Sequence, residues 1–409
     1  MTIRISLFYA AIFLIVGIHV PFWPVWLTAQ GMDAGDIGIL LGSATVMKVF
    51  GSPMIARLVD RTGQRKKAII LLSLFSLFSV LFYFVFSGFA AFLAIAMMTA
   101  LFLSPLNPLT DNLTLMLSNR GQVDYGRVRL WGSVSYALAA LFGGMWLEGR
   151  DEQWVLWLLV GAFALMAITS WILPDVKTQT ISDDETIAAA PRSDPLASEP
   201  GPFRQLLRSP LIWMFLLAAG LAQGSHVVFY GFGTLHWQSI GIGRETIGYF
   251  WAIGVVVEII LFAFATATLK RFDPATLLVA GAFVGVLRWT ITGWSDDVVV
   301  LFVAQALHGL TFGVIHLGAM FFLARAVPVN LSASAQSLYS SVSLGLIFAV
   351  AMPAAGYLYS IFGGQAFYAM AGMSLVALVF AVGLLRRWDG GEISLGDQVS
   401  SRKTDTVAQ

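Results

Sequence analysis

The chain has 409 residues, of which 58% are hydrophobic and 11% are charged, and its formal net charge is +1. Soluble domains carry about 25% charged residues, so this composition excludes an ordinary soluble protein. Cysteine is absent, which excludes disulfide bonds and cysteine metal sites. The chain also lacks a nucleophile elbow, an H-E-x-x-H zinc motif and a phosphate loop. We therefore expect no enzyme activity, no metal, no cofactor and no nucleic-acid partner.

Apolar runs long enough to form membrane-spanning helices recur along the whole chain. About 20 apolar residues in a helix cross a hydrocarbon layer of ~30 Å. The runs lie at residues 6–28, 36–57, 68–87, 90–117, 128–147, 153–173, 210–236, 245–269, 275–294, 298–324, 332–361 and 365–385. The pattern predicts an all-α membrane protein with twelve transmembrane helices.

The basic residues predict the orientation of these helices. Lysine and arginine gather in the loops on the cytoplasmic side of a membrane protein. With twelve helices, 20 of the 24 basic residues fall on one side, whereas the opposite loops hold only Arg150 and Arg244. We therefore expect a multi-pass protein of the cell inner (plasma) membrane with both termini in the cytoplasm.

A polar, proline-containing stretch at 174–209 interrupts the apolar runs. It has no apolar periodicity, so we expect a flexible cytoplasmic linker. The linker separates an N-terminal six-helix bundle (1–173) from a C-terminal six-helix bundle (210–388). Residues 389–409 are again polar, and we expect a disordered cytoplasmic tail.

The two bundles resemble each other weakly at an offset of 210 residues. The matched residues are Gly31 with Gly241, Gly38 with Gly248 and, ten positions further on, the charged pair Lys48 and Glu258. Matched half-proteins are typical of pseudo-symmetric transporters, whose sites lie between the halves near the membrane midplane. A chance match of a few glycines is the alternative.

Four charged residues lie deep inside the apolar runs, away from their ends: Lys48, Asp111, Glu258 and Arg288. All five histidines also lie within or at the ends of these runs. A charge at the centre of a membrane helix costs roughly 3 kcal/mol on insertion scales, so it needs a partner or a water-filled cavity. These residues indicate a protein that moves a polar solute across the membrane.

The loop after the second run carries a pattern of charged residues around a glycine, Asp60-Arg61-Thr62-Gly63-Gln64-Arg65-Lys66. It resembles the D-R-x-G-R-R/K signature of the major facilitator superfamily. We expect a tight turn at Gly63, with Asp60, Arg61 and Arg65 able to latch neighbouring helix ends. An ordinary basic cytoplasmic loop is the alternative.

Polar residues occur at helical spacing on both sides of the loop near residue 120. Asn107, Asp111 and Thr114 share one face of the fourth helix, and Arg129, Ser133 and Tyr136 share one face of the fifth. An ion pair between Asp111 and Arg129 is the expected way to keep both charges in an apolar bundle.

The run Y-G-R-V-R-L-W-G-S-V-S-Y at 125–136 resembles the fifth helix of the lactose permease group. The resemblance implies that Arg129 binds substrate and pairs with Asp111, and that Tyr136 stacks on the substrate. Arg288 and His308 match an arginine and a histidine of that group. Thr311, however, stands where the group has its proton-carrying glutamate.

A closer resemblance is to the phenylpropionate permease branch of the same superfamily. It covers nearly all of the membrane portion and rests on Pro21-Phe22-Trp23, Pro108–Asp111, Asp124–Ser133, Gln223–His226, Tyr230–Phe232, Gly248-Tyr249 through Glu258, Leu287–Trp289 and the two histidines of the tenth helix.

The resemblance implies a monomeric proton symporter of a small aromatic carboxylate such as 3-phenylpropionate, working by alternating access in the lipid bilayer. The surplus of buried cations favours a carboxylate. Arg129 or Arg288 holds the carboxylate, and Tyr136 or Trp23 packs on the ring. The other expected substrate contacts are His226, Tyr230, Asn107 and Lys48. Glu258 or Asp111 carries the proton, with His308 and His226 as relays.

Three other functions stay open. A sugar or nucleoside symporter would share the fifth-helix motif and still use Asp111 and Arg129. A drug exporter usually has a Pro/Gly-rich fifth helix, which is absent here. A membrane sensor that binds its ligand without transport has no distinguishing motif.

Overall fold

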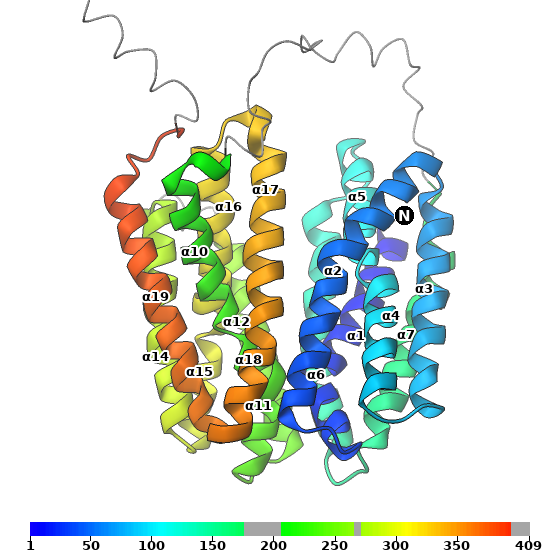
Figure 1. Cartoon of the computed structure of the whole chain (residues 1–409). Coiled ribbons are helices and arrows are strands. Elements are labelled where there is room, and N and C mark those ends of the chain that lie inside the picture. Colours follow the sequence, from blue (N-terminus) through cyan, green and yellow to red (C-terminus); the bar gives the residue numbers. More distant parts are fainter. Residues whose placement is uncertain (176–205, 266–270, 394–409) are drawn as a thin grey trace, which may run out of the picture.

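The computed structural model describes residues 1–175, 206–265 and 271–393. Every regular element in these ranges is helical, which confirms the predicted all-α class. Figure 1 shows two groups of helices side by side, the N-terminal half from blue to green-cyan and the C-terminal half from green to red.

The N-terminal half follows the predicted apolar runs closely. Its elements are α1 (Thr2–Ala29), α2 (Ala34–Thr62), α3 (Arg65–Leu81) with the short η1 (Phe82–Phe84), α4 (Phe89–Leu103), α5 (Leu106–Asn119), α6 (Tyr125–Leu147) and α7 (Gln153–Trp171). The fourth run is a broken helix, because α4 and α5 meet at Ser104 and Pro105.

The C-terminal half contains more interruptions. Its elements are α10 (Pro210–Gly224), α11 (Val227–Ser239), α12 (Arg244–Ala263), α14 (Pro274–Trp294), α15 (Val298–Ala306), η2 (Gly309–Gly313), α16 (Val314–Ala326), η3 (Val329–Leu331), α17 (Ser332–Ser341), η4 (Val342–Leu346), α18 (Ile347–Phe362), η5 (Gly363–Gln365) and α19 (Ala366–Arg387). Two of these segments, η2 and η4, are π-helical turns inside longer helices.

Eleven helical segments of the described chain are long and apolar enough to cross a membrane. The last of them, Ser334–Arg387, has 54 residues and turns back at η5, so it crosses twice. The structure therefore has twelve passes in the described ranges. We call the end of the molecule where α1 begins and α19 ends the terminus side, and the opposite end the far side (Figure 1).

The internal repeat is visible in the backbone. Gly31 (φ 83°) and Gly241 (φ 87°) both adopt the left-handed conformation after α1 and α11. The Met32 N–H donates to Leu27 O at 3.1 Å, and the Ile242 N–H donates to Trp237 O at 2.9 Å. These hydrogen bonds are again 210 positions apart, so the matched glycines Gly31 and Gly241 form the same type of turn in each half.

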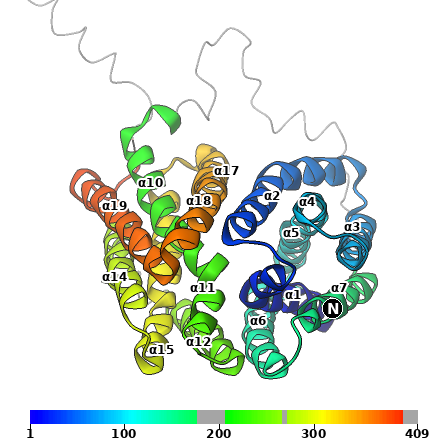
Figure 2. The same cartoon turned by 60° about the horizontal axis from the view of Figure 1, so that its bottom comes forward.

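The halves meet closely on the far side, where glycines let the helices approach. A Cβ added at Gly38 on α2 would lie 2.9 Å from Met352 O on α18. A Cβ added at Gly248 on α12 would lie 2.7 Å from Ala140 O on α6. Both distances are shorter than normal packing contacts. Figure 2 shows these helices at the junction of the two groups.

The buried apolar core reflects the same arrangement. One cluster runs from α1 of the N-terminal half to α11 and α12 of the C-terminal half, and includes Trp26, Trp237 and Phe250. A second cluster, which includes Phe215 and Tyr339, contains only residues of the C-terminal half. The first cluster therefore joins the two halves and extends to the turns on the far side, whereas the second belongs to the C-terminal half alone.

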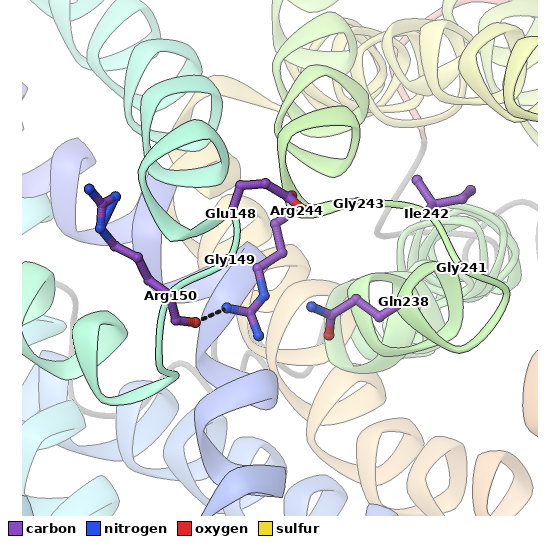
Figure 3. Close-up of a pocket in the computed structure, with 8 residues that line it drawn as sticks. All are labelled: Glu148, Gly149, Arg150, Gln238, Gly241, Ile242, Gly243 and Arg244. Atoms are coloured by element: carbon purple, nitrogen blue, oxygen red, sulfur yellow. Dashed lines mark hydrogen bonds between the residues drawn. The ribbon is translucent and has the colours of Figure 1, made fainter.

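A polar latch joins the halves on the far side. Arg244, at the start of α12, donates from Nη1 to Leu147 O at 2.9 Å. The same nitrogen donates to Arg150 O at 2.7 Å, the bond drawn in Figure 3. Its Nη2 pairs with Glu152. Glu148 Oε2 in turn accepts the Glu245 N–H at 3.0 Å. The end of α6 and the start of α12 therefore satisfy each other's free backbone groups.

The structure corrects two predicted boundaries. The linker was expected to continue to residue 209, yet Leu206 is fully buried in the C-terminal core. The tail was expected to be disordered from residue 389, yet the Ile393 N–H donates to Ala326 O at 2.8 Å and the Ile393 side chain is buried. Isolated apolar residues at the edges of polar segments dock on the core, which composition alone conceals. Residues 176–205 and 394–409 of these segments lie outside the described residues.

We expect Gly248→Ala to lower thermal stability, because the added methyl group meets backbone that cannot rotate away. Overpacking of this kind costs about 1–3 kcal/mol. Gly161→Ala on α7 is the control, since no atom lies within 4 Å of its added Cβ and alanine favours a helix. Thermal unfolding of the two purified variants checks the expectation. Equal midpoints would show that the α6–α12 contact is loose.

Candidate functional site

Helix interruptions mark the middle of the molecule. α10 ends next to His226, and the π-turn η2 begins directly after His308. In the N-terminal half, Pro105 separates α4 from α5. Broken backbone at membrane depth is tolerated where protein or water satisfies it, and π-turns are frequent at functional sites. Polar side chains from both halves surround these breaks.

Asp111 is bound by two tyrosines in the N-terminal half. The Tyr9 hydroxyl on α1 donates to Asp111 Oδ1 at 2.5 Å, and the Tyr125 hydroxyl on α6 donates to the same oxygen at 3.2 Å. Tyr9 also lies 3.4 Å from Thr114 Oγ1. Asp111 and Thr114 thus share a face as predicted. Asn107 is half-buried one turn earlier on α5, and its Oδ1 has no hydrogen-bond partner among the described residues.

Arg129 does not form the predicted ion pair with Asp111; no carboxylate of the described chain lies within ion-pair distance of it. The Arg129 guanidinium carbon lies 4.2 Å from the centre of the Phe13 ring and 5.7 Å from that of Tyr9. The predicted ion pair was wrong because the Tyr9 hydroxyl donates a hydrogen bond to Asp111. The Arg129 guanidinium instead lies over the aromatic rings of Phe13 and Tyr9 on α1. Arg129 is half-buried on α6 and contacts aromatic rings instead of a carboxylate.

The predicted polar face of α6 is present. Arg129, Ser133 and Tyr136 are all half-buried. Ser135 lies on a different face, where its hydroxyl donates to Ala10 O of α1 at 2.7 Å. The helix therefore packs one side on α1 and keeps the other partly accessible.

Arg288 is completely buried in the C-terminal half and has neutral partners. Its Nη1 donates to Thr311 Oγ1 at 2.9 Å and to His308 Nδ1 at 3.1 Å, and its Nη2 donates to Gln305 Oε1 at 2.8 Å. Arg288 Nε and Gln305 Nε2 have no acceptor among the described residues. Donors outnumber acceptors in this cluster, and such a balance favours an anion close by.

The hydrogen bonds assign the two histidine rings. Arg288 can only donate, so His308 Nδ1 is the acceptor and Nε2 carries the ring hydrogen. His226 Nδ1 lies 3.1 Å from Gln223 O, so this nitrogen donates, and Nε2, 3.2 Å from Thr311 Oγ1, accepts. The rings are close neighbours, with centres 5.4 Å apart.

Glu258 lies where the two halves face each other. It is half-buried on α12, next to η2, where a Cβ added at Gly313 would lie 3.6 Å from its Cγ. Its electrostatic partners are Arg129, Tyr136 and Tyr230. The structure thus brings together one acid and one tyrosine of the C-terminal half with a cation and a tyrosine of the N-terminal half.

Two predicted substrate contacts lie apart from this group. Trp23 is 4% exposed and sits in an aromatic cluster inside the N-terminal half, 4.6 Å from Trp26 and 4.9 Å from Tyr83 between ring centres. In this conformation its ring packs on aromatic neighbours of its own bundle, and its contact with a substrate ring stays a prediction. Lys48 is exposed on α2.

The signature loop forms the predicted tight turn. Gly63 adopts the left-handed conformation (φ 65°) between α2 and α3. Arg65 Nη1 lies 2.5 Å from Met116 Sδ on α5, within the same half. Arg61 is exposed in the last turn of α2, and the side chain of Asp60 lies outside the described residues. A latching role for this loop stays a prediction.

Sequence reasoning missed Tyr9, Phe13 and Gln305. None has a motif around it, and Tyr9 and Phe13 look like ordinary apolar residues of a membrane helix. Their i, i+4 spacing was a usable signal, since it places two aromatic rings on one face of α1.

Comparison with known proteins agrees with this fold. Residues 2–370 match the family model described as "MFS_1 like family". The chain is 33% identical over 374 residues to the probable 3-phenylpropionic acid transporter of Escherichia coli (strain K12), covering 91% of this chain and 95% of the relative. It is 24% identical over 388 residues to the raffinose permease of Escherichia coli, covering 91% and 89%.

Solved transporters share the architecture. The structure matches nucleoside transporter NupG with a TM-score of 0.80 and 14% identity, covering 95% of this chain and 99% of that one. It matches the D-xylose-proton symporter with a TM-score of 0.67 and 10% identity, covering 95% and 97%. At these identities the matches show the fold alone, which is the major facilitator fold of transporters rather than enzymes. With the family match over most of its length and its twelve membrane passes, the chain belongs to the MFS_1 like family of membrane transport proteins.

Proposed function

We propose that the protein is a proton-coupled symporter of small aromatic carboxylates such as 3-phenylpropionate. The observation that carries the proposal is Arg129, a half-buried cation on α6 with no carboxylate of the described chain within ion-pair distance. The relative with 33% identity is named for 3-phenylpropionic acid, which supports the same class of substrate.

Arg129 is the carboxylate ligand in this proposal. A guanidinium presents paired donors that match the two oxygens of a carboxylate. Arg288 cannot take this part directly, because it is fully buried and three neutral acceptors already hold it. Arg288 instead adds positive potential and orients His308, whose ring Nε2–H is available to a ligand.

The aromatic ring of the substrate packs against tyrosines from both halves. Tyr136 and Tyr230 are half-buried and lie near each other and near Glu258. Phe348, with its ring centre 6.0 Å from that of Tyr230, extends the apolar wall. Offset and edge-to-face ring contacts add about 0.5–1.5 kcal/mol beyond the apolar area buried.

Glu258 carries the proton. Ionised Glu258 and the substrate carboxylate are both attracted to Arg129. Because two anions compete for one cation, substrate binding and protonation of Glu258 favour each other. This is the reciprocal coupling that symport requires.

The contacts on the far side indicate which part of the transporter must open during transport. In this conformation the latch around Arg244 and the glycine contacts close the far side. Loading from that side requires these contacts to separate while the halves close elsewhere. The distribution of basic residues supports a cytoplasmic terminus side, so the proposed direction of opening alternates between the outside and the cytoplasm.

A sugar or nucleoside symporter is the second candidate, supported by the raffinose permease relative. It is less favoured, because Asp111, which would accept sugar hydroxyls, is already bound by two tyrosine hydroxyls. Competition of labelled 3-phenylpropionate uptake by galactosides and nucleosides separates the two. Binding without uptake would instead identify a sensor.

Arg129→Gln is expected to weaken 3-phenylpropionate binding by more than about tenfold, since hydrogen bonds to charged groups contribute about 1.5–3 kcal/mol. Arg129→Lys should recover part of the loss, because lysine keeps the charge and loses the paired geometry. Arg127→Gln is the matched control, with a side chain that is 87% exposed. Binding is measured by calorimetry on purified protein. Unchanged binding in Arg129→Gln would refute the assignment.

Glu258→Gln is expected to abolish accumulation of substrate driven by a proton gradient while preserving exchange of labelled for unlabelled substrate. The glutamine amide cannot release a proton, so it mimics protonated Glu258. The substrate-loaded transporter can then still change conformation, which is all that exchange requires. Glu245→Gln, exposed on the same helix, is the control. Uptake and exchange in proteoliposomes measure both steps. Normal accumulation by Glu258→Gln, with loss in Asp111→Asn, would place the proton on Asp111.

A further inference from the structure

The acid and the arginine that were expected to pair are held apart by one helix. Tyr9 on α1 is fully buried, with its hydroxyl 2.5 Å from Asp111 Oδ1. Phe13, one turn later, lies beneath the Arg129 guanidinium at 4.2 Å. The Tyr9 ring itself is 5.7 Å from the same guanidinium. Two aromatic residues of one helix face thus contact both charges.

We propose that Tyr9 is a positioning residue that makes the site selective for anions, by binding Asp111 and leaving the charge of Arg129 for the substrate. The inference rests on the proposed function, because it assumes that Arg129 receives the substrate carboxylate. It goes further by naming the residue that decides between a charged and a neutral substrate.

The chemistry of each group supports this division. Asp111 is half-buried in an apolar bundle and requires either a cation or several hydrogen-bond donors. Two phenol donors from Tyr9 and Tyr125 satisfy it. Arg129 requires a partner too, but an aromatic ring attracts a cation without neutralising its charge. The N–H donors of Arg129 therefore stay available to a carboxylate ligand.

Loss of the Tyr9 hydroxyl removes the shorter of the two bonds to Asp111. The carboxylate then has one remaining donor, Tyr125 at 3.2 Å. Arg129, on the same helix as Tyr125, has no carboxylate of the described chain within ion-pair distance. Ion pairing of Asp111 with Arg129 becomes the favourable alternative. Such a pair is neutral and competes with a substrate carboxylate for the same N–H donors.

The test compares the affinity of purified variants for 3-phenylpropionate and for its uncharged amide. Tyr9→Phe is expected to weaken carboxylate binding by about tenfold and to change amide binding by less than about twofold, since only the anion competes with Asp111. Tyr9→Phe/Asp111→Asn should return to within about twofold of Asp111→Asn alone. A structural defect would weaken both ligands and would not be rescued.

Tyr83→Phe is the matched control, since Tyr83 is a buried tyrosine in the aromatic cluster around Trp26. Phe13→Leu provides a second variant that keeps the bond between Tyr9 and Asp111; about fivefold weaker carboxylate binding is expected from the lost cation–π contact. Wild-type affinity in Tyr9→Phe, alongside lost binding in Arg129→Gln, would overturn this inference and leave the proposed function intact. Absence of carboxylate binding by the unaltered protein would instead overturn the proposed function.

Discussion

A charged group inside a membrane bundle must have its hydrogen bonds satisfied by protein, and this constraint organises the whole molecule. Arg288 meets it without an acid: Thr311, His308 and Gln305 accept from a guanidinium that is completely buried. The helix break at η2 brings two of these acceptors to one arginine. Positive charge is thereby held in the C-terminal half, where a neutral ion pair would have cancelled it.

The N-terminal half solves the same problem differently. Asp111 receives two phenol hydroxyls, and Arg129 rests on aromatic rings of α1. In neither half is the arginine within ion-pair distance of a carboxylate of the described chain, and Glu258 is the acid that interacts with Arg129. Selectivity for an anion and coupling to a proton then have one electrostatic origin, the competition of two negative groups for one guanidinium.

The close packing of the halves connects this chemistry with movement. Gly38 and Gly248 occupy repeat-related positions, and each contacts the other half through backbone. The contact is rigid and short-ranged, so it is lost completely when the helices separate. The reciprocal bonds of Arg244 and Glu148 add a polar component at the same end. A two-fold repeat thus yields two equivalent seams, which suits rocking of one half against the other.

The sequence by itself determined the number of membrane passes, the division into halves, the repeat at Gly31 and Gly241 and the charged residues of the site, because hydrophobicity, helical spacing and glycine conformation are local properties. Only the tertiary structure decided which groups meet. Tyr9 binds Asp111, which is 102 positions away in the sequence. Trp23 packs on aromatic residues of its own bundle. Ile393 packs on the core of the C-terminal half. Such contacts depend on the rotation of each helix about its axis and on the packing of its neighbours. No single segment of the chain encodes them.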